Sequence, residues 1–309
     1  MLTILVSAAT ANTAGTLVHE LSQTNSVNVH AFVRDVADPR VSPLAALPNV
    51  TLVKGDFDDK DSVDAALKGV DRAFLVSSCF THDMFERECN FIESAARHSV
   101  PVVKVGTATV LTHPGSRTAY GRNHYCIEAF AQVQRYKVVV LRPNWFMDNL
   151  LAGVEEVKAS GKLSYPCAGD GNKMAMVDPR DVARAAATIL LADESKFNEF
   201  LQERAIEVHG PEMLSLAEEV QALSDGIGYD VKIQAVPPTA LVDVMVSFGM
   251  VKVFAEAFCN TILKLNGDIQ AENRIVNESS ALLTASGWSP KYTVKDWAQS
   301  KKIQGAFAR

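Results

Sequence analysis

Short apolar runs alternate with longer amphipathic stretches from the first residues of the chain, and this alternation limits its fold more than any other feature. The runs are apolar at nearly every position, which is typical of strands in a parallel sheet with both faces covered. We expect strands at residues 2–6, 29–33, 50–54, 72–76, 100–105 and 137–141. We expect helices between them at residues 15–23, 61–68, 84–99 and 120–133. The pattern predicts an α/β fold with a doubly wound parallel sheet.

The pattern becomes more varied after Arg142. Helices are predicted at residues 150–160, 179–191, 214–226, 241–265 and 296–306. Short strands are predicted at residues 163–166, 173–177 and 231–235, with Gly169 and Gly171 in a turn between the first two. A strand at 205–209 is a candidate for a return to the main sheet. We therefore expect a domain of residues 1–150 and a smaller, interleaved lobe made mainly of residues 151–309.

Composition excludes several classes of function. The 309 residues have a net charge of −6 without a marked Lys/Arg cluster, so nucleic acid is not an expected partner. The first apolar run lacks the basic region of a signal peptide, and no run approaches the roughly 18 residues of a membrane span. Five scattered cysteines without C-x-x-C spacing indicate reduced thiols. We expect a cytoplasmic protein with a small-molecule partner, no metal and no membrane contact; the sequence does not predict its oligomeric state.

The turn after the first strand lies where a doubly wound sheet binds the phosphates of a dinucleotide. Glycines are typical there, because they allow a tight turn and a close approach of backbone to phosphate. This chain has Ala8, Ala11 and Ala14 at those positions, and Gly15 follows one step late. An alanine forced to a positive φ costs on the order of 1 kcal/mol or more. We expect weakened dinucleotide binding by the helix N-terminus; the alternative is a tight connection in a fold that has lost its cofactor.

Motifs along the whole chain add a family resemblance. The most specific are LRPNWFMDN at residues 141–149 and VDPRDVA at 177–183, accompanied by YGRNH, GDG, HGP and LS at 120–124, 169–171, 209–211 and 214–215. This order resembles the NmrA-like family of atypical short-chain dehydrogenases/reductases, whose G-A-T-G-N-x-G loop has alanines substituted here. The stretch NTAG at 12–15 is also similar to members that act on ergot-type alkaloids. The resemblance implies a Rossmann-type fold with NADP(H) or NAD(H) along the strand ends.

The resemblance also implies which residues face the cofactor. Arg34 ends the second strand, where an NAD-selective protein often has an acid, and could pair with a 2′-phosphate; a solvated strand-end arginine is the alternative. Asp56 and Phe57 resemble the pair that brackets the adenine. The expected contacts of the first loop are Ala8, Thr10, Ala11, Asn12 and Thr13. Those nearer the ribose and nicotinamide are Ser77, Ser78, Thr107, Pro143, Asn144 and Phe146.

Tyr120 and His124 are the candidate catalytic residues. Four positions apart, they share one helix face, as the Tyr and Lys of ordinary short-chain dehydrogenases do. A histidine can donate a hydrogen bond and titrates near neutrality, but it does not replace a permanent cation. The alternative is that Tyr120 caps a helix and His124 packs at a lobe interface. Glu128, one turn further on, is expected to orient His124 or cap a neighbouring element.

The substrate cleft is expected to be apolar. Its candidate lining residues are Trp145, Lys173, Phe248 and Phe254, with core packing as the alternative for each aromatic residue. Asp178, Arg180 and Asp181 are expected to tie a helix to the body of the fold.

These observations favour an NADP(H)-dependent oxidoreductase that acts on a bulky apolar small molecule, with secondary metabolism as one setting. Two alternatives stay open. One is a redox-neutral enzyme of the same fold (an isomerase, cyclase or lyase) whose cofactor is absent or structural. The other is a non-enzymatic NmrA-type regulator that senses a dinucleotide.

Overall fold

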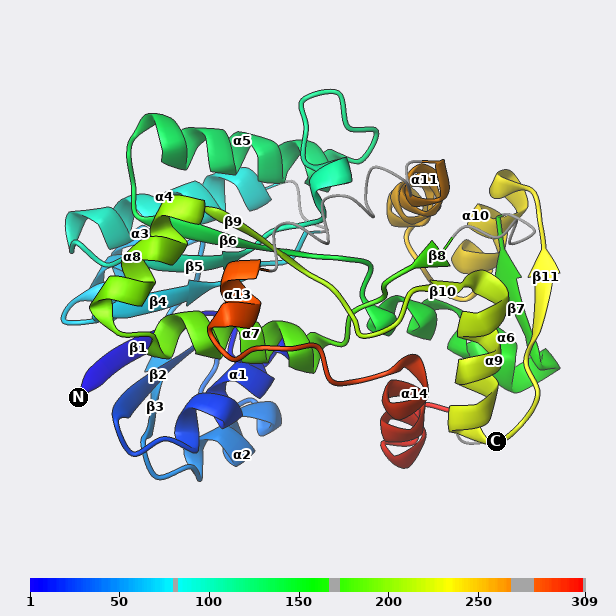
Figure 1. Cartoon of the computed structure of the whole chain (residues 1–309), viewed down its shortest axis with the longest axis horizontal. Coiled ribbons are helices and arrows are strands. Elements are labelled where there is room, and N and C mark those ends of the chain that lie inside the picture. The colour runs from blue at the N-terminus through cyan, green and yellow to red at the C-terminus, as the bar shows by residue number, and fades with distance from the viewer. Residues whose placement is uncertain (80–82, 167–172, 268–280, 308–309) are drawn as a thin grey trace.

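The computed structural model describes residues 1–79, 83–166, 173–267 and 281–307, and its largest element is a parallel sheet. Seven strands of these residues lie in the order β3-β2-β1-β4-β5-β6-β9 (Figure 1). They are β1 (Leu2–Val6), β2 (Val27–Val33), β3 (Val50–Lys54), β4 (Arg72–Leu75), β5 (Val102–Val105), β6 (Val138–Pro143) and β9 (Ala205–Val208). The strand order reverses between β1 and β4, as in a doubly wound sheet, and confirms the predicted fold class.

Helices cover both faces of this sheet. One face packs against α1 (Asn12–Ser22), α2 (Ser42–Ala45), α7 (Pro179–Leu191) and α8 (Glu194–Glu203). The other packs against α3 (Lys60–Leu67), α4 (Met84–Arg97) and α5 (Ala119–Val133). Within β1, Ile4 and Val6 belong to the first core and Leu5 to the second. The strands are apolar at successive positions because neither face meets water.

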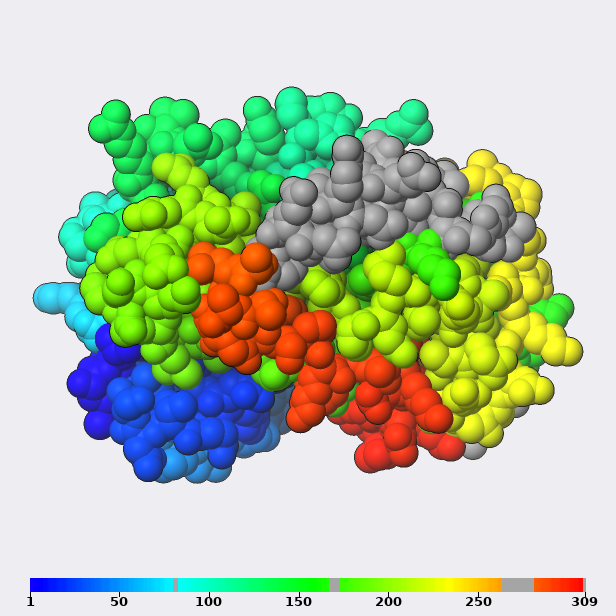
Figure 2. All heavy atoms as spheres, viewed as in Figure 1, coloured from blue at the N-terminus to red at the C-terminus, as the bar shows by residue number. Residues whose placement is uncertain are grey.

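The C-terminal half builds a further lobe with its own core. Its helices are the 3₁₀ helix η3 (Met147–Gly153), α6 (Val154–Ser160), α9 (Leu216–Ile227), α10 (Pro238–Ser247), α11 (Lys252–Gly267) and α14 (Val294–Ile303). Its strands are β7 (Lys162–Tyr165), β8 (Lys173–Met174), β10 (Leu214–Ser215) and β11 (Lys232–Ala235). β7 pairs with β11 in parallel, and β8 pairs with β10 antiparallel. Figure 2 shows the blue N-terminal residues and the yellow residues of α10 and β11 at opposite ends of the molecule.

Several segments cross back from the second half to the sheet. β9 pairs with β6 and confirms the expected return of this strand, while α7 packs against α1. Asp178 caps α7 by accepting the N–H of Arg180. Buried Asp181 accepts the backbone N–H groups of Lys291 and Tyr292, which follow α13 (Ala281–Ala285). The expected structural role of this segment is confirmed, whereas the domain boundary near residue 150 stays a prediction.

Local differences from the expected elements have physical causes. The helix expected at 241–265 is two helices, because the chain turns at Gly249, whose φ is +94°. The region expected as one helix at 150–160 begins as the 3₁₀ helix η3. The helices α2 and α8, and the 3₁₀ helices η1 (Pro39–Val41) and η2 (Thr109–Leu111), were not expected. The turn with Gly169 and Gly171 lies outside the described residues.

Two further structural features of the described part of the chain bear on its function. None of its helices is long and apolar enough to cross a bilayer. It holds no group of three or more His, Cys, Asp or Glu side chains arranged to bind a metal ion. Cys79, Cys89, Cys126 and Cys259 are free thiols, and Cys167 lies outside the described residues.

Candidate functional site

A groove runs across the carboxyl ends of β1, β2, β3 and β4, and we call it the strand-end groove. Its empty volume, including space open to solvent, is about 1200 Å³. It is lined by Ala8, Thr10, Ala11, Phe32, Val33, Arg34, Arg40, Asp56, Phe57, Val76, Ser77, Ser78 and Arg87. Eight of the expected cofactor contacts are therefore gathered here, and these are Ala8, Thr10, Ala11, Arg34, Asp56, Phe57, Ser77 and Ser78.

The first loop shows what the missing glycines change. Ala8 has a φ of +47°, in the left-handed region that favours glycine. Ala11 has φ −81° and ψ 156°, an extended conformation open to any residue. Ala11 is also the N-cap of α1, and no side chain caps this helix. The first N–H groups of α1 are thus left for an anion, and only Ala8 carries backbone strain.

Arg34 differs from the other arginines of the strand-end groove. Arg40 forms an ion pair with Asp38 at 2.6 Å, and Arg87 forms one with Asp58 at 2.5 Å. No residue of the described segments forms an ion pair with Arg34, whose side chain is exposed on the groove. It is therefore the cation that is available to a phosphate.

The strand-end groove continues into a second hollow, the central cavity, and the two share Val76 and Ser77. The central cavity holds about 930 Å³ of open space. It is lined by Thr13, Val76, Ser77, Cys79, Val105, Gly106, Thr107, Ala108, Leu111, Tyr120, His124, Pro143, Asn144, Trp145, Phe146, Asn149 and Phe258. Both candidate catalytic residues line this cavity beside the residues expected near a nicotinamide.

Behind His124 lies a buried ionic group that we call the Lys104 cluster, made of Ser77, Glu88, Lys104 and His124. Lys104 on β5 is fully buried, and its Nζ lies 2.6 Å from Glu88 Oε2 and 2.9 Å from His124 Nδ1. Nζ also donates to the Val105 carbonyl at 2.9 Å. Ser77, on the wall shared by groove and cavity, donates to Glu88 Oε1 at 2.7 Å. A lysine therefore stands next to His124, although it comes from β5 and not from α5, the helix that carries His124.

The Lys104 ammonium fixes the tautomer of His124. An ammonium has only donors, so Nδ1 of His124 must accept, and the ring proton belongs on Nε2. Burial lowers the pKa of His124 well below its usual 6.5, and the charges of Lys104 and Arg142 lower it further. His124 is thus a neutral imidazole at physiological pH. It can offer Nε2–H as a hydrogen-bond donor, but it carries no second proton to give.

Tyr120 is placed in the cavity but is not activated. Its hydroxyl lies 2.5 Å from Thr261 Oγ1 on α11, and Thr261 donates to the Ala257 carbonyl. The phenol proton is therefore directed to Thr261. Burial raises the pKa of Tyr120 well above its usual value. A lowered pKa is what an adjacent lysine would supply, and here Lys104 contacts His124 instead.

Glu128 does not orient His124, contrary to one of the two expected roles. It forms an ion pair with Arg142, whose Nη1 also donates to Thr109 Oγ1 at 2.7 Å. Thr109 in turn hydrogen-bonds Glu207, and burial raises the pKa of that carboxyl. These contacts join α5, η2, β6 and β9.

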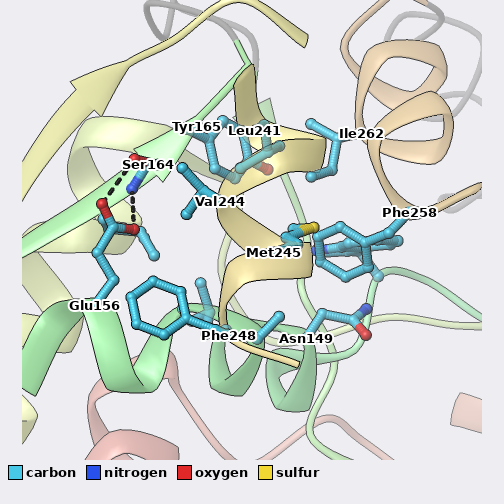
Figure 3. A pocket seen from close by; sticks show the side chains of 15 residues that line it. Asn149, Glu156, Ser164, Tyr165, Leu241, Val244, Met245, Phe248, Phe258 and Ile262 are labelled. Atoms are coloured by element: carbon cyan, nitrogen blue, oxygen red, sulfur yellow. Dashed lines mark hydrogen bonds between the residues drawn. The ribbon is translucent and has the colours of Figure 1, made fainter. Parts of the chain in front are cut away.

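A third hollow, the apolar chamber, adjoins the central cavity, and the two share Trp145, Asn149 and Phe258. It lies between η3, α6, β7, α10 and α11, and its empty volume, including space open to solvent, is about 460 Å³. Figure 3 shows its lining side chains, with Phe248 near one end and Phe258 at the other side.

The other predicted substrate and loop residues lie at different places. Phe254 lies half-buried on α11 and does not line any of the three hollows. Lys173 pairs with Glu218 at the surface, also away from them. Asn12 donates to Asp148 Oδ2 at 2.5 Å and links α1 to η3. Substrate contacts of Phe254 and Lys173 stay predictions.

A parallel sheet with a groove at its strand ends and an uncapped helix N-terminus beside it defines a Rossmann-type α/β protein. The chain belongs to the NmrA-like family, whose sequence model matches residues 2–297. It is 30% identical over 260 residues to the NAD(P)H azoreductase of Xenophilus azovorans, covering 82% of this chain and 84% of that protein.

Solved structures share the fold at low sequence identity. The NADPH-dependent quinone oxidoreductase of Escherichia coli, complexed with NADPH, has a TM-score of 0.77 at 21% identity and covers 97% of this chain and 99% of its own. The negative transcriptional regulator NmrA in complex with NADP has a TM-score of 0.74 at 17% identity, with 98% and 97% covered. The fold therefore occurs in both a reductase and a regulator.

Sequence reasoning missed Glu88 and Lys104. The signal for Lys104 was available, because a single lysine stands inside the apolar strand VVKV of a sheet predicted to be covered on both faces. Such a lysine has to find buried partners. Which partners it finds depends on α4 and α5, and the local sequence does not predict their packing.

Proposed function

We propose that this protein is an NADP(H)-dependent reductase of a bulky, largely apolar carbonyl-type compound. The observation that carries the proposal is the meeting of the strand-end groove and the central cavity at Ser77, beside a His124 whose tautomer Lys104 fixes. The relatives named as NAD(P)H- and NADPH-dependent reductases support the same reaction class. Secondary metabolism and a cytoplasmic location stay predictions.

The described residues fit the cofactor. The uncapped N-terminus of α1 suits a pyrophosphate, and the exposed Arg34 suits a 2′-phosphate. When bound, NADPH supplies the hydride. We expect the preference for NADPH over NADH to depend on Arg34.

The protein's own contribution is polarisation of the substrate. His124 Nε2–H donates a hydrogen bond to the substrate oxygen, on which negative charge develops as the carbonyl is reduced. The oxygen takes its proton from solvent water, because the neutral imidazole has no second proton to give. Because His124 is neutral, it acts as an electrophile that stabilises charge, as a neutral imidazole can. The Lys104 ammonium behind the ring strengthens that donor without being exposed to solvent. Tyr120 is a second, weaker hydrogen-bond donor, because its hydroxyl must first break its hydrogen bond with Thr261.

NADPH oxidation with a panel of azo compounds, quinones and aryl ketones tests the proposal. His124→Ala should lower kcat by about a hundredfold or more, the range that a positioned donor contributes. Tyr120→Phe should lower it less, and Tyr125→Phe, an exposed position on the same helix, should have no effect. Thermal melts and NADPH titrations of each variant show whether it is folded and binds the cofactor.

Three results would overturn the proposal. Undiminished turnover in His124→Ala would move the chemistry elsewhere. Absence of NADPH binding at millimolar concentration, in both the wild type and Ala8→Gly, would favour a redox-neutral enzyme. NADPH binding without turnover of any compound would favour a regulator.

A further inference from the structure

The apolar chamber is the one of the three hollows described above that the proposed reaction does not use. Its side chains are mainly aliphatic or aromatic, among them Leu163, Leu241, Val244, Met245 and Ile262 (Figure 3). It lies between elements of the C-terminal lobe, away from Arg34 and the first loop. A hollow so lined favours an uncharged apolar occupant, because removing apolar surface from water is the main gain on binding there.

The chamber and the central cavity meet at an aromatic partition. Trp145 from the β6–η3 connection and Phe258 from α11 line both hollows, with their ring centroids 5.0 Å apart. Asn149 also lines both, and no residue of the described segments forms a hydrogen bond with its side chain. A molecule that crosses here would therefore pass two rings and one free amide.

The far wall of the chamber sets a charge preference. Glu156 on α6 lines it, and its carboxylate accepts from the Ser164 N–H at 2.9 Å and the Ser164 hydroxyl at 2.7 Å. Both oxygens already have a donor, so the carboxylate does not need a ligand. It would repel a second carboxylate brought to the same wall.

We propose that the apolar chamber binds an uncharged hydrocarbon arm of the substrate, whose carbonyl group lies in the central cavity near His124. The substrate class is thus a carbonyl compound with a ring or polar head and a neutral apolar chain. An arm that ends in a carboxylate is excluded by Glu156. This inference rests on the proposed reductase function for the position of the carbonyl, but the binding of the arm can be measured without turnover.

Calorimetric titration with alkyl phenyl ketones of increasing straight-chain length tests the proposal. Affinity should rise about fourfold for each added methylene until the chamber is full. Val244→Trp, which fills the chamber, should abolish this dependence on chain length and leave the shortest ketone and NADPH unaffected. Val246→Trp is the matched control, because Val246 is 40% exposed on the same helix and does not line the chamber.

A second pair of variants guards against misfolding and tests the charge preference. Val244→Thr keeps the shape and adds a hydroxyl, so it should weaken long-chain binding several-fold even if Val244→Trp does not fold. A chain ending in a carboxylate should bind at least tenfold more weakly than the neutral chain, and Glu156→Gln should reduce that difference.

Separate outcomes identify which proposal fails. If affinity depends on chain length, Val244→Trp abolishes that dependence and no ketone is reduced, the binding of the arm in the apolar chamber is supported and the reductase function is contradicted. If ketones are reduced but their affinities do not depend on chain length, the proposal that the chamber binds the arm is wrong. It is also wrong if Val244→Trp weakens the binding of short-chain and long-chain ketones equally.

Discussion

The loop after β1 lacks the glycines of the NmrA-like loop, and the Lys104 cluster has His124 where ordinary short-chain dehydrogenases have a lysine; the structure compensates for the two losses differently. In the loop, alanine replaces glycine, and Ala8 stays in the conformation that glycine would adopt, with φ +47°. In the cluster, His124 replaces a lysine, and the cation comes from Lys104 on β5. A backbone requirement is tied to its position in the chain, whereas a charge can be supplied by any segment that packs nearby.

The largest expected effect is on stability, through Lys104. Lys104→Met leaves Glu88 as an unpaired buried carboxylate, so the free energy of unfolding should fall by about 3–5 kcal/mol. The double variant Lys104→Met/Glu88→Gln should lose less, because it removes both charges. Lys158→Met, which breaks a surface pair with Glu155, is the control and should cost less than about 1 kcal/mol. Denaturant unfolding measures all three; equal losses for Lys104→Met and Lys158→Met would show that the cluster is not an ionic centre.

The second effect depends on pH and reports the neutral state of His124. Its pKa is lowered well below 6.5 in the folded protein, so below pH 6.5 the unfolded chain takes up a proton that the folded chain does not. The stability of the wild type relative to His124→Gln should therefore fall as the pH falls below 6.5, by about 1.4 kcal/mol per pH unit, and be constant above it. Unfolding curves of both proteins across this range measure the difference. A flat difference curve would mean that His124 is protonated normally and that Lys104 does not control it.

The third effect is on nucleotide binding in the strand-end groove beside the loop after β1. Arg34→Ala should weaken NADPH binding by about tenfold, the value of one charge-assisted contact, and leave NADH binding unchanged. Arg40→Ala should have a smaller effect, because its guanidinium is already paired with Asp38. Titrations with both nucleotides provide the measurement. Equal affinities for NADPH and NADH in the wild type would show that Arg34 does not bind the 2′-phosphate.

The smallest effect separates the two alanines of the loop. Ala8→Gly relieves a positive φ and should raise the free energy of unfolding by up to about 1 kcal/mol. Ala11→Gly relieves nothing and should lower it by about 0.4–1 kcal/mol, because glycine adds entropy to the unfolded chain. If Ala11→Gly tightens NADPH binding, the methyl group of Ala11 obstructs the phosphate in the wild type. If both variants change the free energy of unfolding in the same direction, the difference in φ between Ala8 and Ala11 does not determine their effect on stability.

Much of the fold could be predicted because the strands are short and apolar on both faces. The strands β1 to β6 and the helices α1, α3, α4 and α5 between them follow from that pattern. The helix α8 was missed because its apolar face is narrow, with Phe197 and Phe200 as its buried residues. The division between α10 and α11 was missed because the run around Gly249 stays apolar, and only the φ of that glycine marks the turn.

The candidate site was predicted best where it depends on strand ends. Parallel strands end at one edge, so Ala8, Arg34, Asp56 and Ser77 had to converge whatever their side chains do. The Lys104 cluster was not predicted, since it depends on how α4 and α5 pack against β5. Tyr120 and His124 share a face, as their spacing predicts, yet their hydroxyl and imidazole groups have different partners, Thr261 and Lys104.

The return of β9 to the sheet bears on how the chain folds during its synthesis. Until β9 leaves the ribosome, β6 is an edge strand with unpaired N–H and C=O groups, and the face of α1 that packs on α7 is exposed. The N-terminal half therefore cannot complete its fold while it is being made, although N-terminal domains generally fold first. A premature stop codon in the C-terminal lobe ahead of β9 would yield an aggregation-prone fragment, not a smaller nucleotide-binding protein.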